Sequence, residues 1–322
     1  MTPATSSLSA SVVAAIDDLE LAARLVVEGL RAGGHRSPFH GFSAEFQQHR
    51  PYRVGDDLKY LDWKILARTD RLYSRQFRET TSMSVMIVLD ASASMAFPEQ
   101  GVSKFRYGQV IAASLAYLIA AQGDAVGLMT TSHPPRGLRP DPIGQRTDRL
   151  TYLPAKGGRL HLRSLIAQID QLTPGGSWQP DRVIARGAEL LKRRGAVVVI
   201  SDFYDDDPAT RRELRRVASR GHDVAALQLV SPAETTFPYS GDLDVEDLES
   251  GERRLLNAGA DGGTYRSAHA EFLATWEKQA RRDGIDYALM STEQPPQQAL
   301  RGYLLRRGAT RQSDNAARQF SK

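Results

Sequence analysis

Two stretches of the chain are apolar at almost every position and end in aspartate, SVMIVLD at 84–90 and AVVVISD at 196–202. An unbroken apolar run of this length is typical of a central parallel strand that is buried on both faces of a sheet. Other segments that lie between turn-forming residues predict further strands. These segments are 71–77, 124–131, 150–153, 224–230 and 286–292.

Apolar residues recur at helical spacing in several of the segments that separate these strands. The first amphipathic helix is predicted over 11–32 and ends at Gly33 and Gly34, because glycine readily terminates a helix. Further helices are predicted at 105–122, 161–172, 180–194, 207–220, 267–283 and 297–306. The alternation of strands and helices predicts an α/β fold class, with a doubly wound, mainly parallel sheet flanked by helices.

This pattern divides the chain into three parts. Residues 1–80 are expected to form an N-terminal helix and a charged extension that packs on the main domain. Residues 81–306 are expected to form the α/β domain, with a β-hairpin inserted near 242–258 whose turn contains a Ser-Gly pair. Residues 307–322 are expected to form a flexible polar tail.

The composition narrows the classes of function. The 322 residues contain no cysteine, which removes disulfides, thiol catalysis and thiolate metal sites. The net charge of +4, from 42 basic and 38 acidic residues, gives little support to nucleic-acid or membrane binding. The first residues lack the basic start of a signal peptide, and no run of about 18 apolar residues predicts a membrane span. A cytoplasmic protein is therefore expected.

Asp90 and Asp202 stand at the ends of the two most apolar strands. In an open α/β sheet, ligands bind beyond the carboxyl ends of the strands, where the strand order reverses. Two carboxylates placed there repel each other, and a hard cation with oxygen ligands relieves that repulsion. The loop after the first strand also carries Ser92 and Ser94. Their hydroxyls are expected to face the same side as Asp90, because alternate residues of an extended segment point the same way.

A third loop, TPGGSWQPD, offers a further oxygen ligand to the same site. It places Ser177 after two glycines, which allow the backbone to approach closely. Thr173, at the start of the loop, is the alternative ligand.

The motif Asp90-x-Ser92-x-Ser94 after a buried strand resembles the metal-ion-dependent adhesion site of von Willebrand factor A domains. The resemblance implies a von Willebrand factor A-like, Rossmann-like fold and a metal ion held by Asp90, Ser92, Ser94, Ser177 and Asp202. Ser177 stands where that family has threonine, a change that keeps the hydroxyl. The expected ion is Mg²⁺, or else Mn²⁺ or Ca²⁺, with one coordination position left for a carboxylate of a partner protein.

The segment HRSPFHGFSAEFQQHRPYRVGDDLKYLDWKILARTDRLYSRQF resembles a bacterial family known as domain of unknown function fifty-eight. The resemblance covers roughly residues 30–305, and LDVEDLESGE is similar to the later hairpin of that family. Its members are similar to von Willebrand factor A proteins and are typically encoded beside MoxR-type AAA+ ATPases. The resemblance implies that the chain works with such an ATPase, and with a client protein, in chaperone-like assembly or metal insertion.

The charged stretch 50–64 permits two interpretations. In one, Arg50, Arg53 and Lys59 form a surface that binds a partner. In the other, they join neighbouring aspartates in an ion-pair network that supports the fold. The Gly-Asp-Asp sequence within the stretch predicts a tight turn with an aspartate cap.

Two other classes of function are alternatives to a metal-dependent binding module. A Mg²⁺-dependent phosphoryl-transfer enzyme would use the same carboxylates, but only Lys104 and His133 add further groups near the strand ends. The chain has no P-loop, no G-x-S-x-G and no H-E-x-x-H motif, so no enzymatic activity is expected. A nucleic-acid-binding protein would use the basic stretch 31–78 and would show steep salt dependence.

Overall fold

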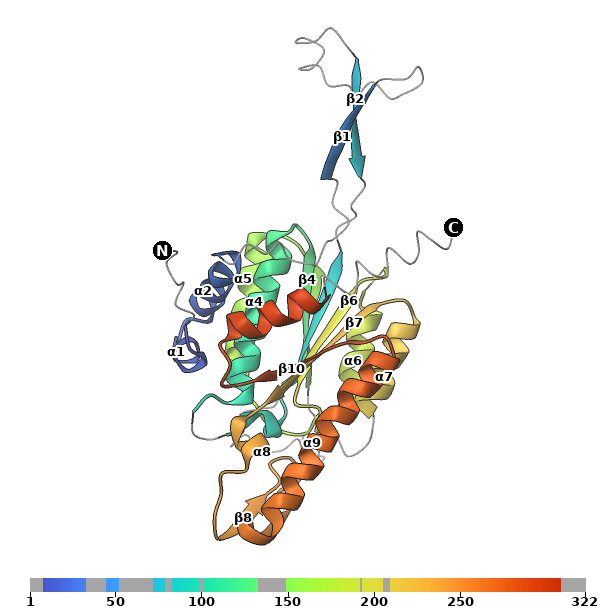
Figure 1. Ribbon diagram of the computed structural model, residues 1–322. Coiled ribbons are helices and arrows are strands. Elements are labelled where there is room, and N and C mark those ends of the chain that lie inside the picture. Colours follow the sequence, from blue (N-terminus) through green and yellow to red (C-terminus); the bar gives the residue numbers. More distant parts are fainter. Residues whose placement is uncertain are drawn as a thin grey trace, which may run out of the picture.

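The computed structural model describes residues 8–32, 45–51, 72–78, 83–98, 101–132, 149–191, 193–204 and 209–307. Its centre is a six-stranded sheet in the order β10-β7-β6-β3-β4-β5 (Figure 1). The strands are β3 Ser84–Leu89, β4 Ala125–Ser132, β5 Arg149–Lys156, β6 Ala196–Ser201, β7 Asp223–Val230 and β10 Asp286–Ser291. Neighbouring strands run parallel except β4 and β5, which are antiparallel. The predicted doubly wound, mainly parallel α/β sheet is therefore confirmed.

The order of the strands reverses between β3 and β6. From β3 the chain continues to β4 and β5 on one side, and it then returns to β6, β7 and β10 on the other. The carboxyl ends of β3 and β6 therefore form the topological switch point, the place where open α/β sheets bind ligands. Asp90 and Asp202 directly follow these two strands.

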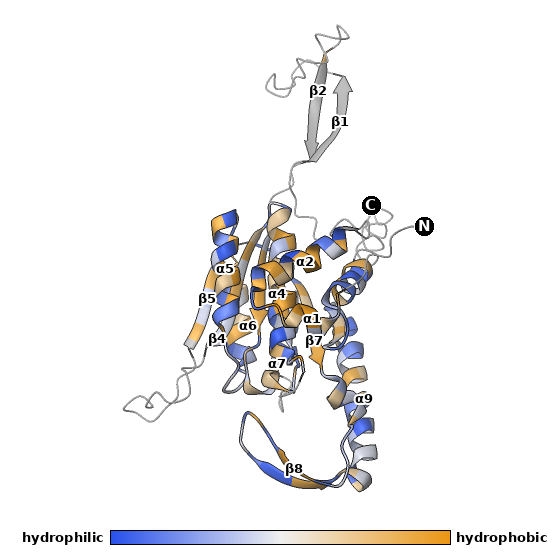
Figure 2. Cartoon of the chain, turned by 90° about the vertical axis from the view of Figure 1, so that its left-hand side faces the viewer, coloured by the Kyte–Doolittle hydropathy of each residue, from blue (hydrophilic) through white to orange (hydrophobic). Residues whose placement is uncertain are grey.

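Helices cover both faces of the sheet and enclose two hydrophobic cores (Figures 1 and 2). One face is covered by α1 Ala10–Ala14, α2 Leu19–Ala32, α4 Lys104–Ala121, α5 Arg159–Gln171 and a helix over 296–307. The other face is covered by α6 Pro180–Glu189, α7 Ala209–Ser219 and α9 Ala258–Arg282. In the part of the chain that the structure describes, no helix has both the length and the apolar character that a membrane span requires.

Strand β3 illustrates why its sequence is apolar at every position. Val85, Ile87 and Leu89 pack into the core beneath α4, whereas Met86 and Val88 pack into the core beneath α6. All five side chains are fully buried, because successive residues of a strand point to opposite faces and both faces carry helices. This two-sided packing fixes the point at which the strand ends and the loop with Asp90 begins.

Several shorter elements complete the fold. They are the 3₁₀ turn η2 Ala93–Ala96, the helix α8 Pro232–Thr236, and the hairpin strands β8 Asp242–Glu246 and β9 Arg253–Asn257. A separate two-stranded antiparallel sheet pairs β1 Glu45–Pro51 with β2 Tyr73–Arg78. The sequence pattern predicted a strand at the position of β2 but none at the position of β1.

Side-chain caps that the apolar pattern did not indicate change two of the predicted helices. One cap divides a helix in two, and the other makes a helix begin earlier. The helix predicted over 11–32 is two helices, because Asp18 starts a new one by accepting a hydrogen bond from the Leu21 amide at 3.1 Å. Helix α9 begins directly after Asn257 and not at 267, because the Asn257 side chain accepts hydrogen bonds from two amides of the first turn. Helix α6 is shorter, and β5 longer, than predicted.

Gly127 provides a test of the packing between β4 and the edge strand β5. It lies at the irregularity in the register of the two strands, and an added Cβ would lie 2.8 Å from the Leu153 carbonyl oxygen. We therefore expect Gly127→Ala to lower the free energy of unfolding by about 1–3 kcal/mol, measured by urea denaturation. The control is Gly263→Ala within α9, where an added Cβ meets nothing within 4 Å. The control is expected to lose no stability, and equal losses in both variants would contradict the prediction.

Candidate functional site

Two buried aspartates stand beyond the central strands of the sheet. The Asp90 amide continues the ladder between β3 and β6 by donating to the Ile200 carbonyl oxygen at 2.9 Å. Asp90 is fully buried, and Asp202 is 1% exposed. The structure therefore brings the two predicted carboxylates together at the switch point, close enough for the charge of Asp202 to act on Asp90.

Asp90 is held by neutral hydrogen-bond donors. The Ser92 amide donates to its Oδ1 at 2.8 Å, and the Ser201 hydroxyl donates to its Oδ2 at 2.6 Å. Burial and the negative charge of Asp202 raise the pKa of Asp90 from 3.8 to about 7, although these hydrogen bonds act in the opposite direction. A buried carboxylate is costly unless a cation compensates its charge. No ion pair between Asp90 and another described residue is present.

The hydroxyls of Ser92 and Ser94 lie next to each other, with 3.1 Å between their oxygen atoms. Ser92 is buried and has an extended backbone, and Ser94 is half-buried within the turn η2 that follows. The loop after β3 therefore places two hydroxyl oxygens side by side within four residues of Asp90, although Ser94 lies in the turn η2 and not in the extended segment that the motif predicted.

Asp202, unlike Asp90, has a cationic partner. The Nζ atom of Lys104, which is 1% exposed, donates to Asp202 Oδ2 at 2.7 Å and to Glu234 Oε1 at 2.6 Å. It also lies 4.8 Å from the centre of the Tyr204 ring. Burial lowers the pKa of Lys104, but the two carboxylates outweigh this effect and raise the pKa above its ordinary value. Lys104 therefore stays charged, and it is unsuited to act as a general base.

The third loop lies against the loop that follows Asp90. Two backbone hydrogen bonds, of 2.8 and 3.0 Å, join Gly175 and Gly176 to that loop, so the glycine pair makes the predicted close approach. The side chains of Ser177 and Thr173 are both exposed. The choice between these two hydroxyls as a ligand stays a prediction.

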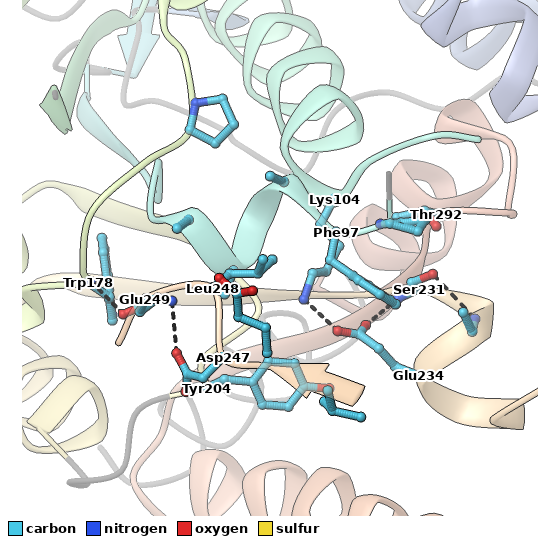
Figure 3. A pocket seen from close by; sticks show the side chains of 18 of the residues that line it. Phe97, Lys104, Trp178, Tyr204, Ser231, Glu234, Asp247, Leu248, Glu249 and Thr292 are labelled. Carbon is cyan, nitrogen blue, oxygen red and sulfur yellow. Dashed lines mark hydrogen bonds and ion pairs between the residues drawn. The ribbon is translucent and has the colours of Figure 1, made fainter. Parts of the chain in front are cut away.

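A further acidic side chain at the site comes from the hairpin, and sequence reasoning did not consider it (Figure 3). The Trp178 amide donates to Glu249 Oε2 at 3.2 Å. Burial raises the pKa of Glu249, and so does Asp202, whereas the hydroxyls of Ser94 and Ser92 favour its charged form. The other carboxylate oxygen, Oε1, is buried and makes no hydrogen bond within 3.5 Å to any described residue.

These side chains adjoin one open cleft, shown in Figure 3. Its lining includes Ser94, Lys104, Ser177, Trp178 and Glu249. Asp90, Ser92 and Asp202 are buried and are not among its lining residues. A ligand that enters the cleft would therefore meet the Ser94 hydroxyl and the Glu249 carboxylate before it reached Asp90.

The donor atoms of the site suit a hard divalent cation. Carboxylate and hydroxyl oxygens are the ligands that Mg²⁺ and Ca²⁺ prefer. Over the described ranges, no three His, Asp or Glu side chains are grouped so that they alone could hold a metal ion. A metal ion here would therefore depend on serine hydroxyls and water in addition to carboxylates. Asp90, a buried carboxyl group without a cationic partner among the described residues, fits such an ion.

Sequence reasoning identified the carboxylates at the strand ends and named Lys104 as a further group nearby, but it did not predict the ion pairs of Lys104 or the approach of Glu249. The lysine pairs with residues 98 and 130 positions later in the chain, and no spacing rule links such positions. One indication was available, since Lys104 is the single lysine in the otherwise largely apolar helix α4. No feature of the hairpin sequence distinguished Glu249 from its acidic neighbours.

Some predicted residues cannot be placed relative to this site. Arg53, Lys59 and His133 lie outside the described residues, and Arg50 belongs to β1, of which the backbone is described. The partner-binding surface of Arg50, Arg53 and Lys59 therefore stays a prediction.

Comparison with known proteins identifies relatives over most of the chain. Residues 48–275 match the family described as "Protein of unknown function DUF58". The uncharacterized protein Mb1516 of Mycobacterium bovis and the uncharacterized protein Rv1480 of Mycobacterium tuberculosis are each 29% identical over 243 residues. Each alignment covers 74% of this chain and 71% of the relative.

Among solved structures, an aerotolerance-related membrane protein from Bacteroides fragilis aligns with a TM-score of 0.43 and 18% identity. That alignment covers 70% of this chain and all of the other.

The buried lysine gives a prediction for stability. Lys104→Met would leave Asp202 and Glu234 buried without their cation, and we expect a loss of about 3–5 kcal/mol in the free energy of unfolding, measured by urea denaturation. Lys278→Met, on the exposed side of α9, is the control and is expected to stay within about 0.5 kcal/mol of the wild type. A Lys104→Met protein as stable as the control would contradict the role given to this ion pair.

The raised pKa of Asp90 gives a prediction for pH dependence in metal-free protein. The folded state holds a proton between pH 4 and 7 that the unfolded state releases, so stability falls as the pH rises through this range. At about 1.4 kcal/mol per pKa unit, the fall attributable to Asp90 is at most about 4 kcal/mol. Asp90→Asn removes this contribution, whereas Asp17→Asn at an exposed position does not. Parallel stability curves for the two variants from pH 4 to 8 would refute the prediction.

Proposed function

This chain belongs to the family of proteins of unknown function DUF58, and on that premise we propose that its switch-point site binds Mg²⁺ and uses it to hold a carboxylate of a partner protein. The chain then acts as a metal-dependent protein-interaction module and not as an enzyme. Mn²⁺ or Ca²⁺ would suit the same oxygen ligands.

The observation that carries this proposal is that only one of the two buried aspartates has a cationic partner among the described residues. Asp202 is paired with Lys104 at 2.7 Å, whereas the hydrogen bonds to Asp90 come from an amide and a hydroxyl. A divalent ion beside Asp90 supplies the missing positive charge. The resemblance of the Asp-x-Ser-x-Ser motif to a metal-ion-dependent adhesion site supports the same assignment.

The donor atoms suggest which residues would bind the ion and which would contribute only charge. Asp90, Ser92 and Ser94 would hold the ion directly, with Ser177 or Thr173 from the adjacent loop as a further hydroxyl. Asp202 would contribute its charge, because its oxygens already accept hydrogen bonds from Lys104 and from the Tyr204 amide. Mg²⁺ keeps several water ligands in proteins, and the exchange of one for a partner's aspartate or glutamate would make recognition depend on the metal.

The charge and the ion pairs of Lys104 favour a binding function over a catalytic one. A phosphoryl-transfer enzyme needs a base or a free cationic group near the metal. Lys104 is instead buried between two carboxylates that hold it in its charged form. It therefore neutralises part of the site and does not serve a substrate.

For the partner we propose a MoxR-type AAA+ ATPase together with its client protein, in chaperone-like assembly or metal insertion. The support is the family resemblance of the chain. The metal-held carboxylate gives the physical form of the contact, because an acidic residue of either protein could fill the open position.

Titration calorimetry with MgCl₂ tests the metal site. We expect saturable binding to the wild type, no measurable binding to Asp90→Ala, and binding about tenfold weaker to Ser94→Ala. Ser164→Ala is the matched control, because this exposed serine lies on α5, where its hydroxyl bonds to its own helix. Circular dichroism confirms that each variant is folded. Equal heats in the wild type and Asp90→Ala, or no heat in either, would refute the proposal.

A further inference from the structure

The hairpin that carries Glu249 is unusually polar for an ordered element. Of the ten residues of β8 and β9, eight are exposed, two are half-buried and none is buried. Leu255 is 83% exposed. Burial of apolar surface, which holds the helices on the sheet, therefore contributes little to the position of this hairpin.

The hairpin is fixed instead by polar contacts at its two ends. At its base, Asn257 donates to Asp242 Oδ1 at 2.6 Å and caps helix α9. At its tip, the carboxylate of Asp247 accepts hydrogen bonds from the amides of Glu249 and Ser250, each at 2.8 Å. These bonds give the tip a defined shape and orient the Glu249 side chain.

Glu249 connects this tip to the switch-point site (Figure 3). Its Oε2 accepts a hydrogen bond from the Trp178 amide at 3.2 Å, in the loop that also contacts the Asp90 loop. The hydroxyls of Ser92 and Ser94 favour the charged form of its carboxylate, whereas the charge of Asp202 disfavours that form. Oε1 is buried without a hydrogen bond to a described residue.

This arrangement is unfavourable for a carboxylate unless a cation is present. Glu249 experiences the negative charge of Asp202, and the buried cation Lys104 is engaged by Asp202 and Glu234. A buried carboxylate oxygen without a donor costs free energy. A metal ion beside Ser92 and Ser94 would remove both costs at once.

We propose that Glu249 is the chain's own ligand for the open coordination position, so that the hairpin closes the site and a partner's carboxylate must displace it. This inference rests on the proposed metal site. The hairpin would then act as a tethered competitor. Because the tether keeps Glu249 at a high effective concentration, an external carboxylate would bind more weakly than to an open site.

The test compares Mg²⁺ binding to wild type, Glu249→Gln and Glu252→Gln. Glutamine keeps an oxygen for the Trp178 amide but loses the charge, and Glu252 is an exposed carboxylate of the same turn. By calorimetry we expect Mg²⁺ to bind Glu249→Gln about tenfold more weakly and Glu252→Gln as tightly as wild type.

Hydrogen exchange of the turn 247–252 gives a second readout that does not depend on heats. We expect MgCl₂ to slow exchange of these amides several-fold in wild type and in Glu252→Gln, and to leave it unchanged in Glu249→Gln and Asp90→Ala. Suppose that Mg²⁺ binds wild type and Glu249→Gln equally, and that MgCl₂ does not change the exchange rate of the turn in any of the proteins. The proposed function then stands and this inference is overturned. Absence of Mg²⁺ binding to wild type overturns both.

Discussion

Buried negative charge at the switch point is the constraint on which the rest of the site depends. Because β3 and β6 are covered by helices on both faces, the aspartates that follow them are withdrawn from water. Lys104 compensates Asp202, but the same ammonium group also holds Glu234, so a single cation serves two carboxylates. Asp90 receives hydrogen bonds without positive charge. The scaffold therefore presents an excess of negative charge toward the cleft, and a cation is its natural complement.

The parts of the site differ in how firmly the fold holds them. Asp90 and Asp202 are fixed by strands with no exposed side chains, and Lys104 is fixed by the first turn of a buried helix. The outer side of the cleft consists of loops and of a hairpin whose strands bury almost no apolar surface. Local opening requires little free energy where few apolar contacts are lost. The site thus combines a rigid interior with an adjustable outer wall, which is the arrangement that exchange of one carboxylate for another requires.

The two buried aspartates of this site were predictable from sequence, whereas the ion pairs of Lys104 and the position of Glu249 were not. An unbroken apolar run of strand length identifies a central parallel strand, so SVMIVLD and AVVVISD placed Asp90 and Asp202 at the ends of such strands without an alignment. The role of Lys104 depends on pairing across 98 and 130 residues, which no local pattern encodes. The position of Glu249 depends on where α9 starts. The Gly-rich sequence after Asn257 disfavours a helix by propensity, yet the asparagine cap begins one there and brings the hairpin back toward the sheet.

An internal carboxylate also bears on how such a site could be selective. A metal ion with a free coordination position attracts any exposed aspartate or glutamate, and these are abundant on protein surfaces. A tethered competitor weakens the apparent binding of an outside carboxylate. The factor is the ratio of the closed state, with Glu249 on the metal, to the open state. Isolated acidic side chains then fail to displace Glu249, whereas a partner that also contacts the cleft walls gains the additional free energy to do so. Selectivity would therefore reside in the surface around the metal, and the metal itself would supply a contact that every suitable partner shares.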